Sequence, residues 1–197
     1  MVALTLPKSI QKVLVVGPIN NKLDKLDVLE KMLPEFDQVV INGNSSFDDH
    51  NLSVAQQITN RLDQLISTGK VVYNTSGADL LFASKLDPSN PIEKWIHDKP
   101  NVVLIDFGGS FQCVVVSGGI PSHLTTQDQL LDNIEVSFAP HPHETYSGGL
   151  GYVICNSPLT KWAPKFYRYS VQLGNTPEGQ VYAFKMDRNG IRRTILL

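Results

Sequence analysis

The chain is poor in cysteine, in net charge and in long hydrophobic runs. Its 197 residues include two cysteines, and the formal net charge is −2. Two cysteines are too few for a disulfide-rich secreted scaffold or a cysteine-based zinc site. A near-neutral chain lacks the excess of Lys and Arg that nucleic acid and anionic membranes attract. No apolar run reaches the ~18 residues that a membrane span requires.

The N-terminal residues 1–8 also lack the basic head and long apolar stretch of a signal peptide. We therefore expect a protein of the cytoplasm or another reducing compartment, not a secreted one, with buried thiols at Cys113 and Cys155. Neither nucleic acid binding nor membrane insertion is expected. Hydrophobic residues make up 42% and charged residues 18%, and no linker divides the chain. Residues 1–197 are expected to form a single domain.

Strand and helix signals alternate over the first part of the chain. The expected elements are strands over 13–16, 39–41 and 71–73, and helices over 23–33 and 53–66. Pro34 ends the first helix, while Ser53 and Gly69 are the expected N-cap and stop of the second. This alternation with short loops predicts parallel α/β structure.

The second half of the chain is richer in strand signals and is expected to be mostly antiparallel. Residues 84–100 predict a short helix within a surface loop, and residues 187–190 predict a hairpin turn. The other expected elements are a helix over 125–131 and strands over 102–105, 111–116, 134–138, 151–155, 166–173, 180–186 and 191–196.

Four segments carry the motif positions of a known family in the family's order. They are Gly-Pro-Ile-Asn-Asn at 17–21, Asn-Gly-Asn at 42–44, Ser-Gly-Gly-Ile-Pro at 117–121 and Pro-His-Pro-His at 140–143. With their strand and helix context they resemble the calcineurin-like metallophosphoesterase superfamily over nearly the whole chain. The resemblance implies an α/β fold, a four-layer α/β/β/α sandwich with two mixed sheets.

The resemblance also implies a two-metal site, and this sequence lacks most of the ligands. In the family, two cations ~3.5–4 Å apart clamp a phosphate and activate a water. Holding them that close requires anionic ligands, and a neutral amide cannot bridge them as the family's aspartate does. The corresponding positions here are Pro18, Asn20, Asn44, Gly77, Ala78 and Ser117, with His141 and His143 retained. Asn74 is an alternative position for the ligand asparagine, and the acidic residue of that motif is retained as Asp79.

These substitutions predict a catalytically inactive metallophosphoesterase-like protein without a metal or other cofactor. It would act as a protein-binding or structural subunit of a larger assembly, either a multisubunit complex or a viral particle. Aromatic residues and Arg dominate binding hot spots. The expected partner-binding residues are Trp162, Phe166, Tyr167, Arg168 and Tyr169. The same pattern also fits a loop entering a strand with alternate aromatic residues packed inward.

The alternative function is an active phosphoesterase with relocated ligands. His141 and His143, joined by carboxylates from Asp48, Asp49 or Asp79, would then hold Mn²⁺, Zn²⁺ or Fe. The histidines also fit a polar loop, and the two neighbouring aspartates also fit a solvated helix cap. A third hypothesis is a weak phosphate site at the helix N-terminus near residues 20–22.

Overall fold

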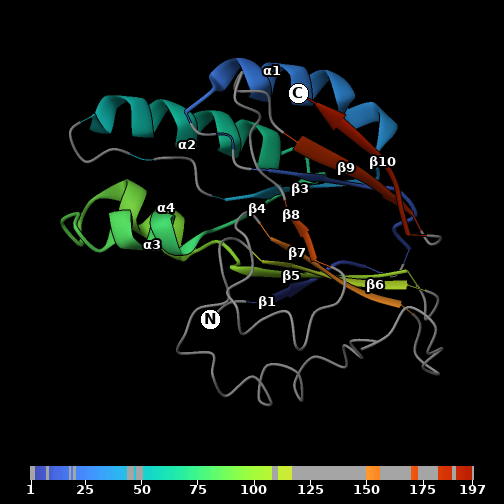
Figure 1. The fold of residues 1–197 in the computed structure, drawn as a ribbon. Coiled ribbons are helices and arrows are strands. Elements are labelled where there is room, and N and C mark those ends of the chain that lie inside the picture. Colours follow the sequence, from blue (N-terminus) through green and yellow to red (C-terminus); the bar gives the residue numbers. More distant parts are fainter. Residues whose placement is uncertain are drawn as a thin grey trace, which may run out of the picture.

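The computed structural model shows an α/β protein in which two helices cover a central sheet (Figure 1). The structure describes residues 3–7, 9–17, 19, 21–43, 47, 51–107, 111–116, 150–155, 170–172, 182–187 and 190–196. The strands within these ranges form two five-stranded sheets.

The first sheet contains the three strands that were predicted for the first part of the chain. Its strand order is β10-β9-β2-β3-β4. The parallel strands are β2 (Val13–Val16), β3 (Gln38–Asn42) and β4 (Val71–Asn74), and β9 (Tyr182–Asp187) and β10 (Gly190–Leu196) are joined antiparallel. The hairpin predicted at 187–190 is confirmed, since Asp187 pairs with Gly190. Strand β9 also pairs antiparallel with β2, which places the last hairpin beside the central parallel strands.

Helix α1 (Leu23–Met32), continued by a 3₁₀ turn (Leu33–Glu35), and helix α2 (Leu52–Ile66) cover one face of this sheet (Figure 1). Successive residues of a strand point to opposite faces, so Leu14 and Val16 face these helices. The helices contribute Leu26, Leu29, Ile58, Leu62 and Leu65 to the same buried cluster. Burying each such side chain stabilises the fold by about 1.5–3 kcal/mol. Because these residues recur at helical spacing, they lie on one face of each helix, and that face is the buried one.

Helix α2 confirms the predicted helix but not its predicted N-cap. The cap is Asn51, whose Oδ1 accepts a hydrogen bond from the Val54 N–H at 3.2 Å. Ser53 lies inside the first turn instead, because both residue types cap helices and only the local backbone decides between them. At the other end, Gly69 adopts a φ of +74° and donates its N–H to the Ile66 carbonyl at 2.9 Å. This left-handed conformation favours glycine.

The other face of the first sheet packs against the second sheet. The second sheet has the order β1-β5-β6-β7-β8. These strands are β1 (Ala3–Thr5), β5 (Val102–Asp106), β6 (Phe111–Val116), β7 (Leu150–Cys155) and β8 (Ser170–Gln172). Val13, Val15 and Val40 from the first sheet share a buried cluster with Val103 and Ile105 of β5. Strands β2 and β3 are therefore buried on both faces, which explains their continuous apolar runs.

The expectation of a mostly antiparallel second half is wrong for two pairings in the second sheet. Strands β5 and β6 are antiparallel as predicted, but β6–β7 and β7–β8 are parallel, and β1, a strand that was not predicted, is parallel to β5. Short apolar runs carry no information on strand direction. Parallel neighbours need a crossover of a dozen or more residues, and the segments 117–149 and 156–169 are long enough to provide one.

Two short helices lie between β4 and β5. Helix α4 (Pro91–His97) confirms the short helix predicted within 84–100, whereas α3 (Gly77–Ala83) occupies residues that were interpreted only as a motif loop. The two helices pack through Phe82, Ala83, Ile92 and Ile96, together with Ala55 of α2. The elements predicted over 125–131 and 134–138 lie outside the described residues. In the described ranges, no helix is long and apolar enough to cross a bilayer.

The strand register separates the two cysteines. Cys113 on β6 is paired with Tyr152 on the parallel strand β7, three positions before Cys155. Three positions span about 10 Å along a strand. A disulfide needs Cα atoms within about 7 Å. The register therefore supports the prediction that Cys113 and Cys155 do not form a disulfide with each other.

Candidate functional site

The candidate site is the edge of the first sheet at which β2, β3 and β4 all end. In α/β sheets, ligands bind outside the carboxyl ends of parallel strands. The residues after these strands are the ones that sequence comparison with the phosphoesterase motifs singled out. The structure describes part of this edge, including residue 43 after β3 and residues 75–76 after β4.

The loop after β2 turns sharply into α1. Ile19 is buried in the helix-facing cluster, and its carbonyl accepts a hydrogen bond from the Lys22 N–H at 3.1 Å. Asn21 adopts a φ of +61°, a conformation that asparagine tolerates better than most residues. Pro18 and Asn20 lie outside the described residues. The turn therefore places α1 directly after the strand, with Lys22 as an N-cap that makes no side-chain capping bond.

Two asparagines meet where β3 and β4 end side by side. Asn42 and Asn74 are paired in the parallel ladder, and both are fully buried, with 0% of their surface exposed. The Asn74 side chain donates from Nδ2 to Asn42 Oδ1 at 2.8 Å. The next residue, Gly43, donates its N–H to the Asn74 carbonyl at 2.7 Å. Neutral amide groups thus occupy the centre of the described edge.

Asp79 lies in the first turn of α3, directly beneath this amide pair, and is 1% exposed. Its Oδ2 accepts hydrogen bonds from the Ser76 N–H at 2.8 Å and from the Tyr73 hydroxyl at 2.9 Å. Ser76 Oγ accepts the Asp79 N–H at 3.0 Å, which completes a reciprocal capping box. The retained acidic residue is therefore engaged in starting a helix and in holding a tyrosine of β4.

The remaining contacts close the strand ends tightly. Thr75 donates both its N–H, at 2.7 Å, and its hydroxyl, at 3.1 Å, to the Pro100 carbonyl just before β5. A Cβ atom added to Gly43 would lie 2.5 Å from Asn74 O, 2.6 Å from Asp79 Oδ2 and 2.7 Å from Ser76 N. Only glycine fits at this close approach between the β3 end and the start of α3.

The structure places the other predicted site residues as follows. Gly77 and Ala78 are exposed in the first turn of α3, while Asn74 is the asparagine at the end of the strand. Outside the described residues lie Asn44, Asp48, Asp49, Ser117, His141, His143, Trp162, Phe166, Tyr167, Arg168 and Tyr169. The described ranges contain no group of three or more His, Cys, Asp or Glu residues arranged to hold a metal.

The donors at this edge do not fit a pair of divalent cations. Two cations held ~3.5–4 Å apart need anionic ligands that bridge and neutralise them. The described donors are the amides of Asn42 and Asn74, the hydroxyls of Thr75 and Ser76 and the carboxylate of Asp79, and each side chain makes at least one protein hydrogen bond. The buried Oδ1 of Asn74 lies outside these bonds, but it is a neutral amide oxygen and does not supply the negative charge that bridging two cations requires. By sequence, the positions of the first aspartate and of the bridging aspartate are Pro18 and Asn44. We therefore derive no metal-dependent step for this edge.

The sequence analysis did not predict the two side-chain contacts that organise this edge, Asn42 with Asn74 and Ser76 with Asp79. The Asn42–Asn74 contact joins residues 32 positions apart, and only the register of β3 and β4 brings them together. The capping box left a local signal, because Ser76 followed by Asp79 three residues later is the pattern of a helix start. That signal could have predicted α3.

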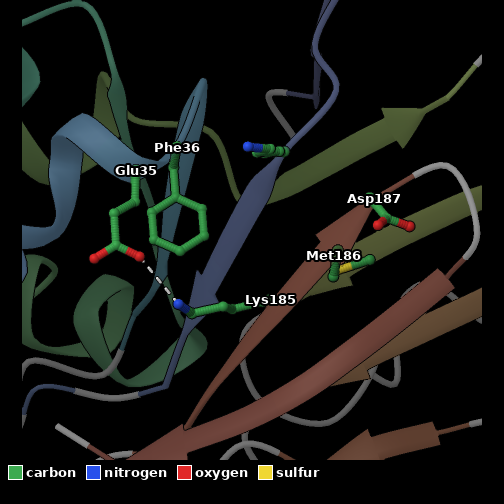
Figure 2. Close-up of a pocket in the computed structure, with 6 residues that line it drawn as sticks. Glu35, Phe36, Lys185, Met186 and Asp187 are labelled. Carbon is green, nitrogen blue, oxygen red and sulfur yellow. Dashed lines mark hydrogen bonds and ion pairs between the residues drawn. The ribbon is translucent and has the colours of Figure 1, made fainter.

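A pocket, called the hollow below, lies at the edge of the same sheet opposite to the candidate site (Figure 2). Its volume is about 250 Å³, and it is lined by Lys12, Glu35, Phe36, Lys185, Met186 and Asp187. Lys185 Nζ lies 3.1 Å from Glu35 Oε2 and 5.2 Å from the centre of the Phe36 ring (Figure 2). Two lysines face two carboxylates here, so the hollow carries no net charge to select an anion or a cation. No residue of this hollow was predicted as a site.

Asp37 holds the chain beside that hollow. Its Oδ2 accepts the N–H groups of Gln11 and Lys12, both at 2.9 Å. These two hydrogen bonds lower the pKa of the Asp37 carboxyl from its ordinary value of 3.8, because they favour the ionised form. The residue is exposed, so this interaction positions the start of β2 at a modest gain in stability.

Comparison with known proteins identifies the fold. No family model and no curated protein matches the sequence. Among solved structures, the chain is similar to a protein described as a "putative diadenosine tetraphosphatase", with a TM-score of 0.51, 15% identity, and coverage of 98% of this chain and 97% of that one. It is also similar to a serine/threonine phosphatase from Saccharomyces cerevisiae that resembles human phosphatase PP5, with a TM-score of 0.50, 13% identity and coverage of 99% and 83%. Both are calcineurin-like phosphoesterases, and at these identities the similarity shows that this chain shares their fold and nothing further.

Proposed function

We propose that this chain is a metallophosphoesterase-like protein that does not hydrolyse phosphoesters and serves as a protein-binding or structural subunit of a larger assembly. The observation that carries the proposal is the buried Asn42–Asn74 amide pair at the carboxyl edge of the sheet. A catalytic centre of this fold needs charged ligands around that edge. Among the described residues of this edge, the side chains of Asn42, Asn74, Thr75 and Ser76 are neutral. The carboxylate of Asp79 is hydrogen-bonded within the protein.

The chemistry of the lost ligands supports the absence of two-metal catalysis. A bridging carboxylate offsets the repulsion between two cations, and a neutral amide such as Asn44 does not. Proline at 18 has no side-chain donor atom at all. Asp79, the carboxylate retained from the family motif, already accepts two hydrogen bonds within the protein.

The proposal includes the four-layer α/β/β/α arrangement of the fold. Helices α1 and α2, the first sheet and the second sheet supply three successive layers through the two shared clusters. The fourth layer of this arrangement rests on the resemblance to the phosphoesterase superfamily. The separation of Cys113 from Cys155 is in keeping with a cytoplasmic or other reducing location.

The partner-binding surface belongs to the same proposal and rests on the sequence. Trp162, Phe166, Tyr167, Arg168 and Tyr169 would contact the partner, a multisubunit assembly or a viral particle. A pull-down from native extract with Trp162→Ala or Arg168→Ala should recover clearly less partner than the wild type. The double variant His141→Ala/His143→Ala is the matched control and should recover as much as the wild type. Equal recovery by all of the variants would contradict this surface.

Metal analysis combined with a phosphatase assay tests the absence of catalysis. Purified protein exposed to Mn²⁺ and then desalted should hold far less than stoichiometric metal. Turnover of a generic aryl phosphate should be the same for the wild type and for His141→Ala/His143→Ala. Stoichiometric metal, together with turnover that His143→Ala abolishes, would overturn the proposal in favour of an active enzyme with relocated ligands.

A further inference from the structure

The polar contacts at the carboxyl edge join three separate stretches of the chain: the end of β3, the stretch from the end of β4 into α3, and Pro100 just before β5. The end of β3 is bonded to the end of β4 through Asn42 and Asn74 and through the Gly43 N–H. The end of β4 is bonded to α3 through Tyr73 and Asp79. Thr75 is bonded to the Pro100 carbonyl before β5.

We propose that these residues form an amide clamp that holds the strand ends together in place of divalent cations. The amide clamp is defined as Asn42, Gly43, Asn74, Ser76 and Asp79. The inference rests on the proposed function, because it assumes that the edge carries no metal centre. It goes further by assigning the structural task of a metal pair to specific hydrogen bonds.

Burial gives the amide clamp its strength. Asn42 and Asn74 are fully buried, and Ser76 and Asp79 are almost so. A hydrogen bond away from water is electrostatically stronger, and a buried group that loses its partner carries the full desolvation cost. The Asn42–Asn74 bond has a near-ideal length of 2.8 Å and links residues of two neighbouring strands. Replacing either asparagine by alanine therefore leaves the other asparagine buried without this hydrogen bond.

Gly43 makes the amide clamp possible by its size. The hypothetical Cβ at this position meets a backbone oxygen, a backbone nitrogen and a carboxylate oxygen, all closer than real Cβ atoms approach. The β3 end is therefore in close contact with the residue after β4 and the first turn of α3, with no room for a side chain at position 43.

The amide clamp predicts that the folded state does not depend on divalent cations. Urea unfolding of the wild-type protein should have the same midpoint in excess EDTA and in millimolar Mn²⁺. A cation present at 100 times its dissociation constant would raise the ratio of folded to unfolded protein about 100-fold, which is readily measured. A shift of that size on adding Mn²⁺ would overturn both the amide clamp and the proposed function.

A double-mutant cycle tests the amide clamp by itself, in EDTA. Asn42→Ala and Asn74→Ala should each lower the folded-to-unfolded ratio roughly 5- to 150-fold, because each strands a buried partner. The double variant should be more stable than the sum of the two single effects predicts, by roughly fivefold or more in the same ratio. The exposed Asn60→Ala is the matched control and should change the ratio by no more than about twofold.

The outcomes separate the two proposals. Purely additive single and double variants, with no response to Mn²⁺, would overturn the amide clamp and leave the proposed function intact. If the variants do not fold, hydrogen exchange of the wild type decides the matter. The Gly43 and Thr75 amide protons should then exchange as slowly in EDTA as in Mn²⁺. Fast exchange at both in EDTA would overturn the clamp.

Discussion

Three glycines provide a matched test of how tightly the end of β3 is packed. Gly43 has no room for a Cβ, since three atoms lie within 2.7 Å of where it would be, and two of the three are backbone atoms. Gly77 begins α3 with nothing within 4 Å of an added Cβ. Gly69 also has open space but adopts a φ of +74°. Replacing glycine by alanine therefore meets a steric barrier at Gly43, no barrier at Gly77 and a conformational barrier at Gly69.

The expected costs follow from these environments. Gly43→Ala should destabilise the fold by about 3 kcal/mol, at the upper end for overpacked positions, because backbone atoms cannot rotate out of the way. Gly69→Ala should cost about 1 kcal/mol, the penalty for a left-handed residue with a Cβ. Gly77→Ala should be neutral or stabilise the fold by up to about 1 kcal/mol, because alanine favours the helix and restricts the unfolded chain.

Urea unfolding followed by circular dichroism measures all three variants on one scale. With a slope of about 2 kcal/mol per molar urea, Gly43→Ala should lower the midpoint by roughly 1.5 M and Gly69→Ala by roughly 0.5 M. Gly77→Ala should leave the midpoint unchanged or raise it. A Gly43→Ala protein as stable as Gly77→Ala would refute the close approach of the β3 end to α3, and with it the geometry of the amide clamp.

Three further predictions concern single side chains. Tyr73→Phe removes the buried 2.9 Å hydrogen bond to Asp79 and should cost about 1.5–3 kcal/mol in urea unfolding, whereas an unchanged midpoint would mean that this bond adds nothing. Arg61→Ala removes the ion pairs of α2 with Glu30 and Asp27 of α1, at 2.7 and 2.8 Å, and should lower the free energy of unfolding by about 1 kcal/mol. Arg61→Lys should have an intermediate effect. A loss of stability that does not shrink in high salt would argue against an ionic origin. Because the folded-state pKa of Asp37 is lowered, its ionised form contributes stability above about pH 4 that is lost as the pH falls through the folded pKa. Asp37→Asn should therefore be less stable than the wild type by up to about 1 kcal/mol near pH 6, and the difference should shrink as the pH falls below about 4; a constant difference from pH 6 downward would contradict the assignment.

Local patterns predicted most of the first sheet and its helices. Strands β2, β3 and β4 and helices α1 and α2 follow from apolar spacing, because burial of one helix face and of strand residues is encoded within a few positions. The β9–β10 hairpin follows from a turn sequence that two adjacent strands require. The N-cap of α2 and the existence of α3 were decided by single hydrogen bonds, which apolar spacing does not specify.

Strand direction in the second sheet lay beyond such patterns. Strands β6, β7 and β8 are parallel, although their short apolar runs would suit either direction. The direction depends on where the long connections run, and that is a property of the whole chain. The resemblance of four ordered motif segments to a phosphoesterase was the better guide, and the similarity to two solved phosphatase structures supports it at the level of the fold.

The sequence by itself determined which chemical groups stand at the motif positions: proline and asparagine in place of aspartate, and one retained carboxylate at Asp79. Chemical identity is local, so the prediction that anionic ligands are missing at these positions rests on the sequence and its resemblance to the family. Only the tertiary structure decided what the remaining groups do. Strand register brings Asn42 to Asn74 across 32 residues, and packing brings Lys185 to Glu35 across 150. Such contacts arise from the arrangement of elements that are distant in the chain, which no spacing of neighbouring residues specifies.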